Sequence, residues 1–250
     1  PPVAAPLGGK YIILDGATRL TAFRRLGYPH MILHVVDLEK RQVRLDTWRH
    51  AVRGLSPDEL LRLLRETPGL ALTPRPAESL VQLSSAASAP DGAGSASQAG
   101  AHSTVGSLIT ADGRGFLLHT AGHETGDADW LAALNQMVEG YGRWGQVERT
   151  MTAEVSLLAA QYADLAALVS FPLFTTGEIL ALAARGRTVP AGITRFIIPG
   201  RVLRLNAPLE MLAGDAPLAV KQDWLEDLLR DRLARRQIRY YEEPVVLLDE

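Results

Sequence analysis

The spacing of apolar residues near the start of the chain predicts a strand–helix–strand unit. Four apolar positions at residues 11–14 are typical of a buried strand, and an acidic residue and a glycine follow them directly. Apolar side chains then recur at helical spacing over residues 17–26, and Gly27 is placed to end that helix in the left-handed conformation. The apolar run at residues 30–38 predicts the second strand.

The rest of the chain continues with mixed helical and extended patterns, so the predicted fold class is α+β. Ser56, followed by Pro57 and Glu59, has the residue types of a capped helix N-terminus. The pair Asp112-Gly113 between two apolar runs predicts a β-hairpin. The other predicted elements are extended segments at residues 43–52 and 188–206, helices at 127–139, 178–184 and 223–236, and a closing strand at 238–250.

Residues 84–104 consist mostly of alanine, serine and glycine. Such a segment cannot bury enough apolar surface to offset the entropy cost of ordering it, so it is expected to be a flexible insert. The predicted organisation is therefore a first domain at residues 1–52 and a second, mixed α/β domain at residues 53–250 that carries the insert.

The composition limits the function classes without selecting one. The 250-residue chain is 47% hydrophobic and carries a formal net charge of −2, so no overall positive field attracts nucleic acid. It contains no cysteine, which excludes disulfides, thiolate catalysis and cysteine-ligated zinc and fits a cytoplasmic location. No apolar run is long enough to span a bilayer, and residues 1–10 lack the features of a signal peptide. Because the chain has no initiator methionine, it reads as part of a longer protein.

The turn at Asp15-Gly16 joins a strand end to a helix start, and this arrangement allows two interpretations. Gly16 permits a sharp turn and the close approach of a ligand, while the helix N-terminus and Arg19 offer donors and positive charge to phosphate oxygens. Asp15 could then hold Mg²⁺ or orient a nucleophile. In the alternative interpretation, Asp15 only caps the helix.

Other candidate residues have structural explanations that need no ligand. Trp48 and His50 alternate on one face of an extended segment, a pattern typical of a packed tryptophan beside a hydrogen-bonded histidine. Trp130 and Trp144 flank a predicted helix and are expected in the core. The basic run at residues 230–239 is expected to be the solvated face of a helix, with a nucleic-acid contact as the alternative.

The remaining histidines give little support for a metal site. His102, His119 and His123 are spread over a predicted loop and a hairpin end, without the close spacing that metal ligands usually show. The sequence therefore does not predict a histidine-ligated metal.

The sequence around the turn, "LDGATRLTAFRRLG", resembles the D-G-x-x-R signature of the ParB/sulfiredoxin superfamily. Three later blocks are similar to blocks of the free L-serine kinases of that superfamily, among them kinases of siderophore biosynthesis. These blocks are "DTWRHAV" at residues 46–52, "TVPAGITRF" at 188–196 and "GRVLRLNAPLEML" at 200–212. They occur in the family's order, and the resemblance covers most of the chain outside the insert. It implies a ParB/sulfiredoxin-like N-terminal domain at residues 1–52.

The resemblance also implies a reaction and a set of site residues. The reaction is phosphoryl transfer from ATP, or from ADP in some relatives, to the hydroxyl of free L-serine with Mg²⁺, giving O-phospho-L-serine for siderophore or amino-acid biosynthesis. Asp15 matches the catalytic and metal-binding part of the pattern. The residues matching the nucleotide-binding part are Gly16, Ala17, Thr18 and Arg19. The residues matching the blocks that approach the amino acid are Trp48, His50, Thr194 and Arg195.

Two departures from the family pattern bear on activity. Thr18 stands where relatives usually have histidine, so this position keeps a hydroxyl donor but loses the imidazole. The family's catalytic glutamate lies ahead of the motif, in a segment that this chain begins too late to contain. We therefore expect nucleotide binding but reduced turnover from the chain as given. A non-enzymatic ParB-like module that binds nucleotide or DNA stays as the alternative; it predicts a helix-turn-helix and a basic domain, and the sequence shows neither.

Overall fold

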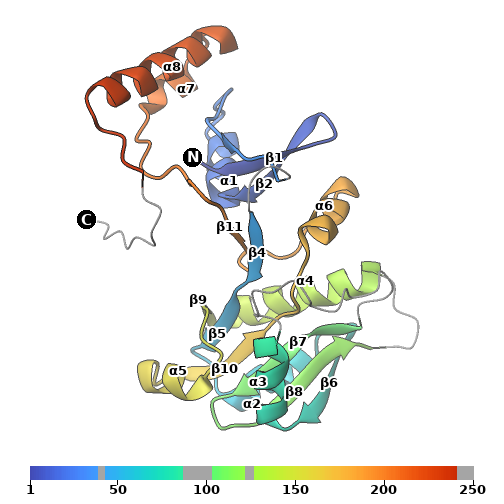
Figure 1. Ribbon diagram of the computed structural model, residues 1–250. Helices are drawn as coiled ribbons and strands as arrows, with labels where there is room; N and C mark the ends of the chain where they lie inside the picture. The colour runs from blue at the N-terminus through green and yellow to red at the C-terminus, as the bar shows by residue number, and fades with distance from the viewer. Residues whose placement is uncertain (39–42, 87–102, 122–126, 241–250) are drawn as a thin grey trace. The chain divides into compact units, whose positions relative to one another are not determined.

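The computed structural model describes residues 1–38, 43–86, 103–121 and 127–240, and the chain forms two compact units (Figure 1). Unit 1 consists of Pro1–Arg44 together with Phe196–Glu250, and unit 2 consists of Leu45–Arg195. This division differs from the expected ranges 1–52 and 53–250, because the residues after 195 group with the N-terminal segment rather than with the residues that precede them.

A three-stranded sheet organises the N-terminal part of unit 1, in the order β2-β1-β3. β1 (Val3–Leu7) pairs antiparallel with β2 (Lys10–Asp15) and parallel with β3 (His34–Val35). The sequence pattern did not predict β1, because its residues VAAPL are mostly small and include a proline, and such residues have low strand propensity. The side chains that β1 buries completely are Val3, Ala4 and Ala5.

Helix α1 (Ala17–Arg25) follows β2 and confirms the predicted helix, including the way it ends. Gly27 has a φ of 70°. Its N–H donates to the carbonyl of Arg24 at 3.1 Å, and the N–H of Tyr28 donates to the carbonyl of Phe23 at 3.1 Å. These two bonds form a Schellman motif, which requires a residue in the left-handed conformation at the glycine position.

Two expectations for this region need correction. The strand predicted at residues 30–38 is reduced to the two residues of β3, since only these pair with β1. In the strand predicted at residues 11–14, Leu14 is buried but Tyr11 is 58% exposed, because β2 lies at an edge of the sheet. Helix α1 likewise has no buried residue.

The described part of unit 1 ends with two helices, α7 (Leu209–Ala213) and α8 (Leu218–Ala234). Lys221 on α8 is buried. Its ammonium group donates to the carbonyls of Leu212 and Gly214 at 3.0 and 2.5 Å. The lysine thereby satisfies carbonyl groups that the C-terminal end of α7 leaves without helical partners.

Unit 2 is built on an antiparallel six-stranded sheet in the order β6-β8-β7-β10-β5-β9. Its strands are β5 (Arg49–Arg53), β6 (Leu70–Arg75), β7 (Thr104–Thr110), β8 (Gly115–Thr120), β9 (Gln146–Thr150) and β10 (Leu165–Ser170). The helices of this unit are α2 (Pro57–Arg65), α3 (Ala77–Ala86), α4 (Asp127–Trp144), α5 (Val155–Gln161) and α6 (Thr176–Ala184). Strands β4 (Arg44–Thr47) and β11 (Thr194–Ile197) form a separate two-stranded sheet.

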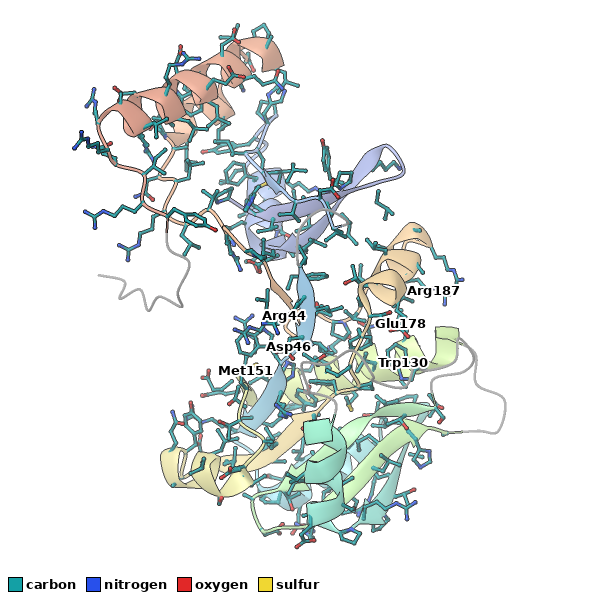
Figure 2. The ribbon with its side chains drawn as sticks, in the orientation of Figure 1. Arg44, Asp46, Trp130, Met151, Glu178 and Arg187 are labelled. Atoms are coloured by element: carbon teal, nitrogen blue, oxygen red, sulfur yellow. The ribbon has the colours of Figure 1, made fainter. Side chains whose placement is uncertain are left out.

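Helix α4 supplies a stripe of fully buried side chains to the core of unit 2 (Figure 2 labels the first of them, Trp130). The stripe consists of Trp130, Leu134, Met137 and Tyr141, at the alternating spacing of four and three residues that keeps side chains on one helix face. The expectation that Trp144 is also in the core is wrong, because it is the last residue of α4 and is 65% exposed.

Local sequence signals in unit 2 are confirmed. The hydroxyl of Ser56 accepts the N–H of Glu59 at 3.3 Å, and the Glu59 carboxylate accepts the N–H of Ser56 at 2.8 Å, which is a complete capping box. The Asp112-Gly113 turn joins β7 to β8, with a φ of 87° at Gly113. The helices predicted at residues 127–139 and 178–184 correspond to α4 and α6, and in unit 1 the helix predicted at residues 223–236 corresponds to α8, all with shifted ends.

Several expectations fall wholly or partly outside the described residues. Of the insert at 84–104, residues 87–102 are outside, while its first residues end α3 and its last begins β7. Of the closing strand at 238–250, residues 241–250 are outside, and 238–240 form no strand. His102 and His123 are also outside. The described part of the basic run at 230–239 is mostly exposed, as expected for a solvated face.

Two kinds of feature are absent from the described ranges. Within them, no group of three histidine, aspartate or glutamate side chains is placed to hold a metal ion. Nor does any helix in this part of the chain have the length and apolar character needed to cross a membrane.

Candidate functional site

The predicted turn lies at the junction of β2 and α1 in unit 1. β2 ends at Asp15, and Gly16, with a φ of 90°, is the N-cap of α1. No side chain caps this helix end, so the interpretation of Asp15 as a capping residue is wrong. The N–H of Leu20 donates to the carbonyl of Gly16 at 3.0 Å, and the N–H groups before it have no acceptor within the helix. An anion at this position would meet these donors and the positive end of the helix dipole.

Gly16 is required at the turn by its conformation and by its surroundings. Its φ of 90° is strained for any residue with a Cβ. A Cβ at this position would lie 2.8 Å from the Cβ of Pro2 and 3.2 Å from a guanidinium nitrogen of Arg19. The glycine therefore allows the backbone to pass close to both groups at the helix start.

The carboxylate of Asp15 forms ion pairs with two arginines. The Arg201 guanidinium donates to the Oδ2 atom of Asp15, and the Nη2 atom of Arg19 lies 3.5 Å from the same oxygen. The Arg19 side chain is 51% exposed and the Arg201 side chain is 33% exposed. Burial lowers the pKa of Arg201 from its ordinary value, yet an arginine stays protonated at neutral pH. Two positive charges against one negative charge leave an accessible surface that favours an anion.

Sequence reasoning assigned no role to Arg201. The residue lies in the block at 200–212 that resembles the serine kinases, and that block was the available signal. Its contact with Asp15 spans 186 residues of sequence, so the pairing could not be inferred from local pattern. Ala17 and Thr18, which were predicted to contact phosphates, are exposed in the first turn of α1.

The predicted magnesium ligand, Asp15, has properties that fit that role. Its carboxylate is 42% exposed, and Mg²⁺ is commonly held by one or two carboxylates together with substrate phosphates. To bind the ion, the carboxylate would exchange its pairing with Arg201 for coordination of the metal.

The second group of predicted residues gathers around Trp48 in unit 2. The backbone N–H of Trp48 donates to the carbonyl of Ile193 at 2.7 Å, which brings the blocks at 46–52 and 188–196 together. The Arg195 guanidinium lies 4.8 Å from the centre of the Trp48 ring, and the Arg149 guanidinium lies 5.8 Å from it. Both distances are within the range of cation–π attraction.

Asp46, on β4, adds a carboxylate to this group (Figure 2). Its Oδ2 atom lies 3.8 Å from a guanidinium nitrogen of Arg195, and its Oδ1 atom accepts the N–H of Thr47 at 2.7 Å. The side chains of Asp46 and Arg195 are 29% and 37% exposed. The site therefore presents one carboxylate, that of Asp46, and the guanidinium groups of Arg195 and Arg149 beside an aromatic ring.

His50 is buried behind this site. Its Nδ1 atom lies 2.7 Å from the hydroxyl of Tyr141, and its Nε2 atom lies 3.1 Å from the carbonyl oxygen of Gly192. The Phe171 ring packs edge-on against it at 4.8 Å. This is the packed, hydrogen-bonded histidine that the bare pattern predicted, and both ring nitrogens are engaged within the protein.

The surroundings of His50 favour the neutral form of its ring. Burial is the main cause that lowers the pKa of His50, and the charge of Arg149 lowers it further, while the bond to Gly192 acts in the opposite direction. Burial also raises the pKa of the Tyr141 hydroxyl, so this group stays protonated and can donate. The pair is thus a neutral donor and a neutral acceptor.

The chain is similar over nearly its whole length to a curated relative, the ATP-dependent L-serine kinase SbnI of Staphylococcus aureus (strain NCTC 8325 / PS 47). The two are 27% identical over 248 residues, which is 99% of this chain and 82% of the relative. No family model matches the chain.

Solved structures share the fold. SbnI with a C-terminal truncation has a TM-score of 0.59 and 20% identity, and the match covers 93% of this chain and 82% of that one. A free serine kinase in complex with AMP has a TM-score of 0.56 and 16% identity, covering 79% of this chain and 73% of that one. The mixed arrangement of helices and sheets is therefore that of these kinases.

Proposed function

We propose that this chain is a free L-serine kinase, which transfers a phosphoryl group from a nucleotide to the hydroxyl of L-serine and releases O-phospho-L-serine. The observation that carries the proposal is the similarity to an ATP-dependent L-serine kinase across 248 residues. The shared fold with free serine kinase structures that contain AMP or ADP supports a nucleotide as the phosphate donor. The signature at residues 15–19 supports a ParB/sulfiredoxin-like nucleotide-binding domain in the N-terminal part of unit 1.

In this proposal the turn after β2 binds the nucleotide phosphates. The N–H groups of the first turn of α1 donate to phosphate oxygens, and Gly16 lets the phosphate approach the backbone. Arg19 and Arg201 add charge-assisted donors. When a phosphate arrives, Arg201 exchanges the Asp15 carboxylate for phosphate oxygens and leaves that carboxylate available.

Asp15 would then be the protein ligand of a bound Mg²⁺, and it is the carboxylate of this chain that we assign to catalysis. A bound Mg²⁺ supplies neutralisation of the charge that develops on the transferred phosphoryl group. The part of Asp15 is to hold a negative charge at the strand end, next to the donors of the helix start. Thr18 contributes a hydroxyl donor where relatives usually have an imidazole.

The group around Trp48 binds the amino acid. Free serine carries an ammonium and a carboxylate, and the pair of Asp46 and Arg195 offers the complementary charges. The Trp48 ring holds the Arg195 guanidinium by stacking, which limits its conformational freedom before substrate binds. Thr194 adds a hydroxyl next to Arg195 on β11.

The test is a product assay with purified protein, Mg²⁺, L-serine and either ATP or ADP, with the product identified by mass spectrometry. We expect O-phospho-L-serine from L-serine and no phosphorylated product from L-alanine, which lacks the hydroxyl. The comparison of the two nucleotides identifies the donor. A protein that binds nucleotide but makes no phosphoserine with either donor would contradict the kinase and favour the non-enzymatic nucleotide-binding module.

A further inference from the structure

We propose that Tyr141 is a positioning residue of the amino-acid site, because its hydroxyl donates to the Nδ1 atom of His50 and orients the ring, whose Nε2–H in turn holds the segment at residues 192–195 against Trp48. The inference rests on the proposed function, since it concerns the same site. It assigns His50 an indirect role in place of the substrate contact expected from the sequence.

The first step is the tautomer of His50. The carbonyl oxygen of Gly192 can only accept a hydrogen bond, so the Nε2 atom at 3.1 Å must carry the ring proton. In the neutral ring the Nδ1 atom is then the acceptor, and the hydroxyl of Tyr141 at 2.7 Å must be its donor. The direction of both hydrogen bonds is thereby fixed by the chemistry of the partners.

The second step is the rigidity of the donor. Tyr141 is completely buried and ends the stripe of core side chains on α4. The ring of His50 meets that of Tyr141 edge-on, with 6.0 Å between their centres. Because the Tyr141 ring is packed in the core on a long helix, its hydroxyl has little freedom to move. The hydrogen bond from this hydroxyl therefore holds the His50 ring in one orientation.

The third step links His50 to the substrate segment. Gly192 has a φ of 90°, and a Cβ there would lie 3.6 Å from the Nε2 atom of His50. The next residue, Ile193, is completely buried, and its carbonyl accepts the N–H of Trp48. Two hydrogen bonds from one short stretch of chain therefore fix residues 192 and 193, two positions before Arg195.

The charged and titratable neighbours of His50 support this role. Arg149 lies opposite His50 on β9, and Tyr141 faces it from α4. A second proton on His50 would place a buried positive charge beside Arg149 and would turn the Nδ1 acceptor into a donor. The tyrosine hydroxyl, as the donor to Nδ1, stabilises the neutral form of the ring.

The decisive variant is Tyr141→Phe, which removes one oxygen and retains the packed ring. Nitrogen NMR of the histidine rings should show the Nε2–H tautomer of His50 in both proteins, because the carbonyl of Gly192 only accepts, and a shifted Nδ1 resonance in the variant that has lost the donor. We expect the KM for L-serine to rise about tenfold, while nucleotide affinity and kcat stay within about twofold. Tyr162→Phe is the matched control, because Tyr162 is a half-buried tyrosine whose hydroxyl accepts a bond from Gln161. It should leave the NMR signals of His50 and the KM for L-serine unchanged.

A second pair of variants separates positioning from direct contact. In His50→Gln, the side-chain amide can still donate to the carbonyl of Gly192, so we expect the KM for L-serine to stay within about threefold. In His50→Ala this donor is lost, and the KM should rise at least tenfold. Equal damage in both variants would overturn the proposal, because it would mean that the ring itself is needed at the substrate.

Amide hydrogen exchange tests the role of Tyr141 independently of kinase activity. We expect faster exchange at residues 192–195 in Tyr141→Phe, whether or not the protein phosphorylates serine. If the unmodified protein makes no phosphoserine, the kinase proposal fails while the NMR and exchange readings still decide the role of Tyr141. An unchanged Nδ1 resonance of His50 together with unchanged exchange in Tyr141→Phe would overturn the positioning role.

Discussion

Asp15 is bound by one arginine from the next helical turn and by another from 186 residues further along the chain. The carboxylate offsets one of these two positive charges, and the other remains to attract an anion. This charge balance favours the binding of an anion such as phosphate at the turn. The charge balance at the turn can therefore be tested one side chain at a time.

Replacing Arg19 by alanine should weaken nucleotide binding at least tenfold. The change removes a charge-assisted hydrogen bond to phosphate, which contributes about 1.5–3 kcal/mol. Arg25→Ala, at the opposite end of the same helix, is the control and should leave the affinity within about twofold. Calorimetric titration with nucleotide gives both values, and an unchanged affinity in folded Arg19→Ala protein would exclude Arg19 from the phosphate site.

Gly16→Ala and Gly8→Ala form a matched pair, because both glycines have positive φ values of 90° and 55°. The new methyl group meets nothing within 4 Å at Gly8, but at Gly16 it would press on Pro2 at 2.8 Å. We expect Gly16→Ala to lose at least tenfold in nucleotide affinity and to be less stable than Gly8→Ala by about 1–3 kcal/mol, the usual cost of overpacking. Equal behaviour of the two variants in calorimetry and urea unfolding would show that the close approach at Gly16 is not needed.

At the scale of elements, the features predicted from sequence are those whose signals lie within a few residues. The capping box at Ser56 and the hairpin turn at Asp112-Gly113 are complete in the local sequence, so both could be predicted. Strand β1 could not, because its small residues become a strand only through pairing with β2 and β3. The same reason limits how much of the candidate site could be predicted. The turn at Asp15 followed from local pattern. Its partner Arg201 and the Tyr141–His50 pair depend on tertiary contacts and could not be predicted.

Removing the capping side chain at Ser56 should destabilise unit 2 through helix α2. Ser56→Ala leaves the N–H of Glu59 without its acceptor, and the loss of such a cap costs about 1 kcal/mol. Ser156→Ala, an exposed position within α5, is the control and should change stability by less than about 0.5 kcal/mol. Urea unfolding followed by circular dichroism measures both, and identical midpoints would contradict the contribution of the cap.

At the scale of the whole molecule, the two units differ in how the chain builds them. Unit 2 is one continuous stretch, whereas unit 1 needs two segments that are separated by all of unit 2. The candidate residues around Trp48 belong to the continuous unit, and the turn at Asp15 with Arg201 belongs to the discontinuous one. The two groups of candidate residues therefore depend on different parts of the folding process.

Residues 45–195 should fold by themselves when produced as a separate protein. They contain the six-stranded sheet and the helices whose side chains form its core, which is what an independent domain requires. Residues 1–44 alone are the control and should show no cooperative transition, because so short a segment buries too little surface. Absence of a cooperative urea transition in the 45–195 protein would mean that unit 2 needs the remainder of the chain.

Because unit 1 is discontinuous, its two segments are synthesised at different times during translation. A ribosome that adds about 5–20 residues per second needs roughly eight to thirty seconds to make residues 45–195. Throughout that interval the nascent β1–β2 hairpin is outside or leaving the exit tunnel, while Arg201 and the helices that follow it have not been synthesised. Its unpaired strand edges are then open to neighbouring nascent chains, so we expect chaperone engagement to concentrate on the first segment and to end only after the last one emerges.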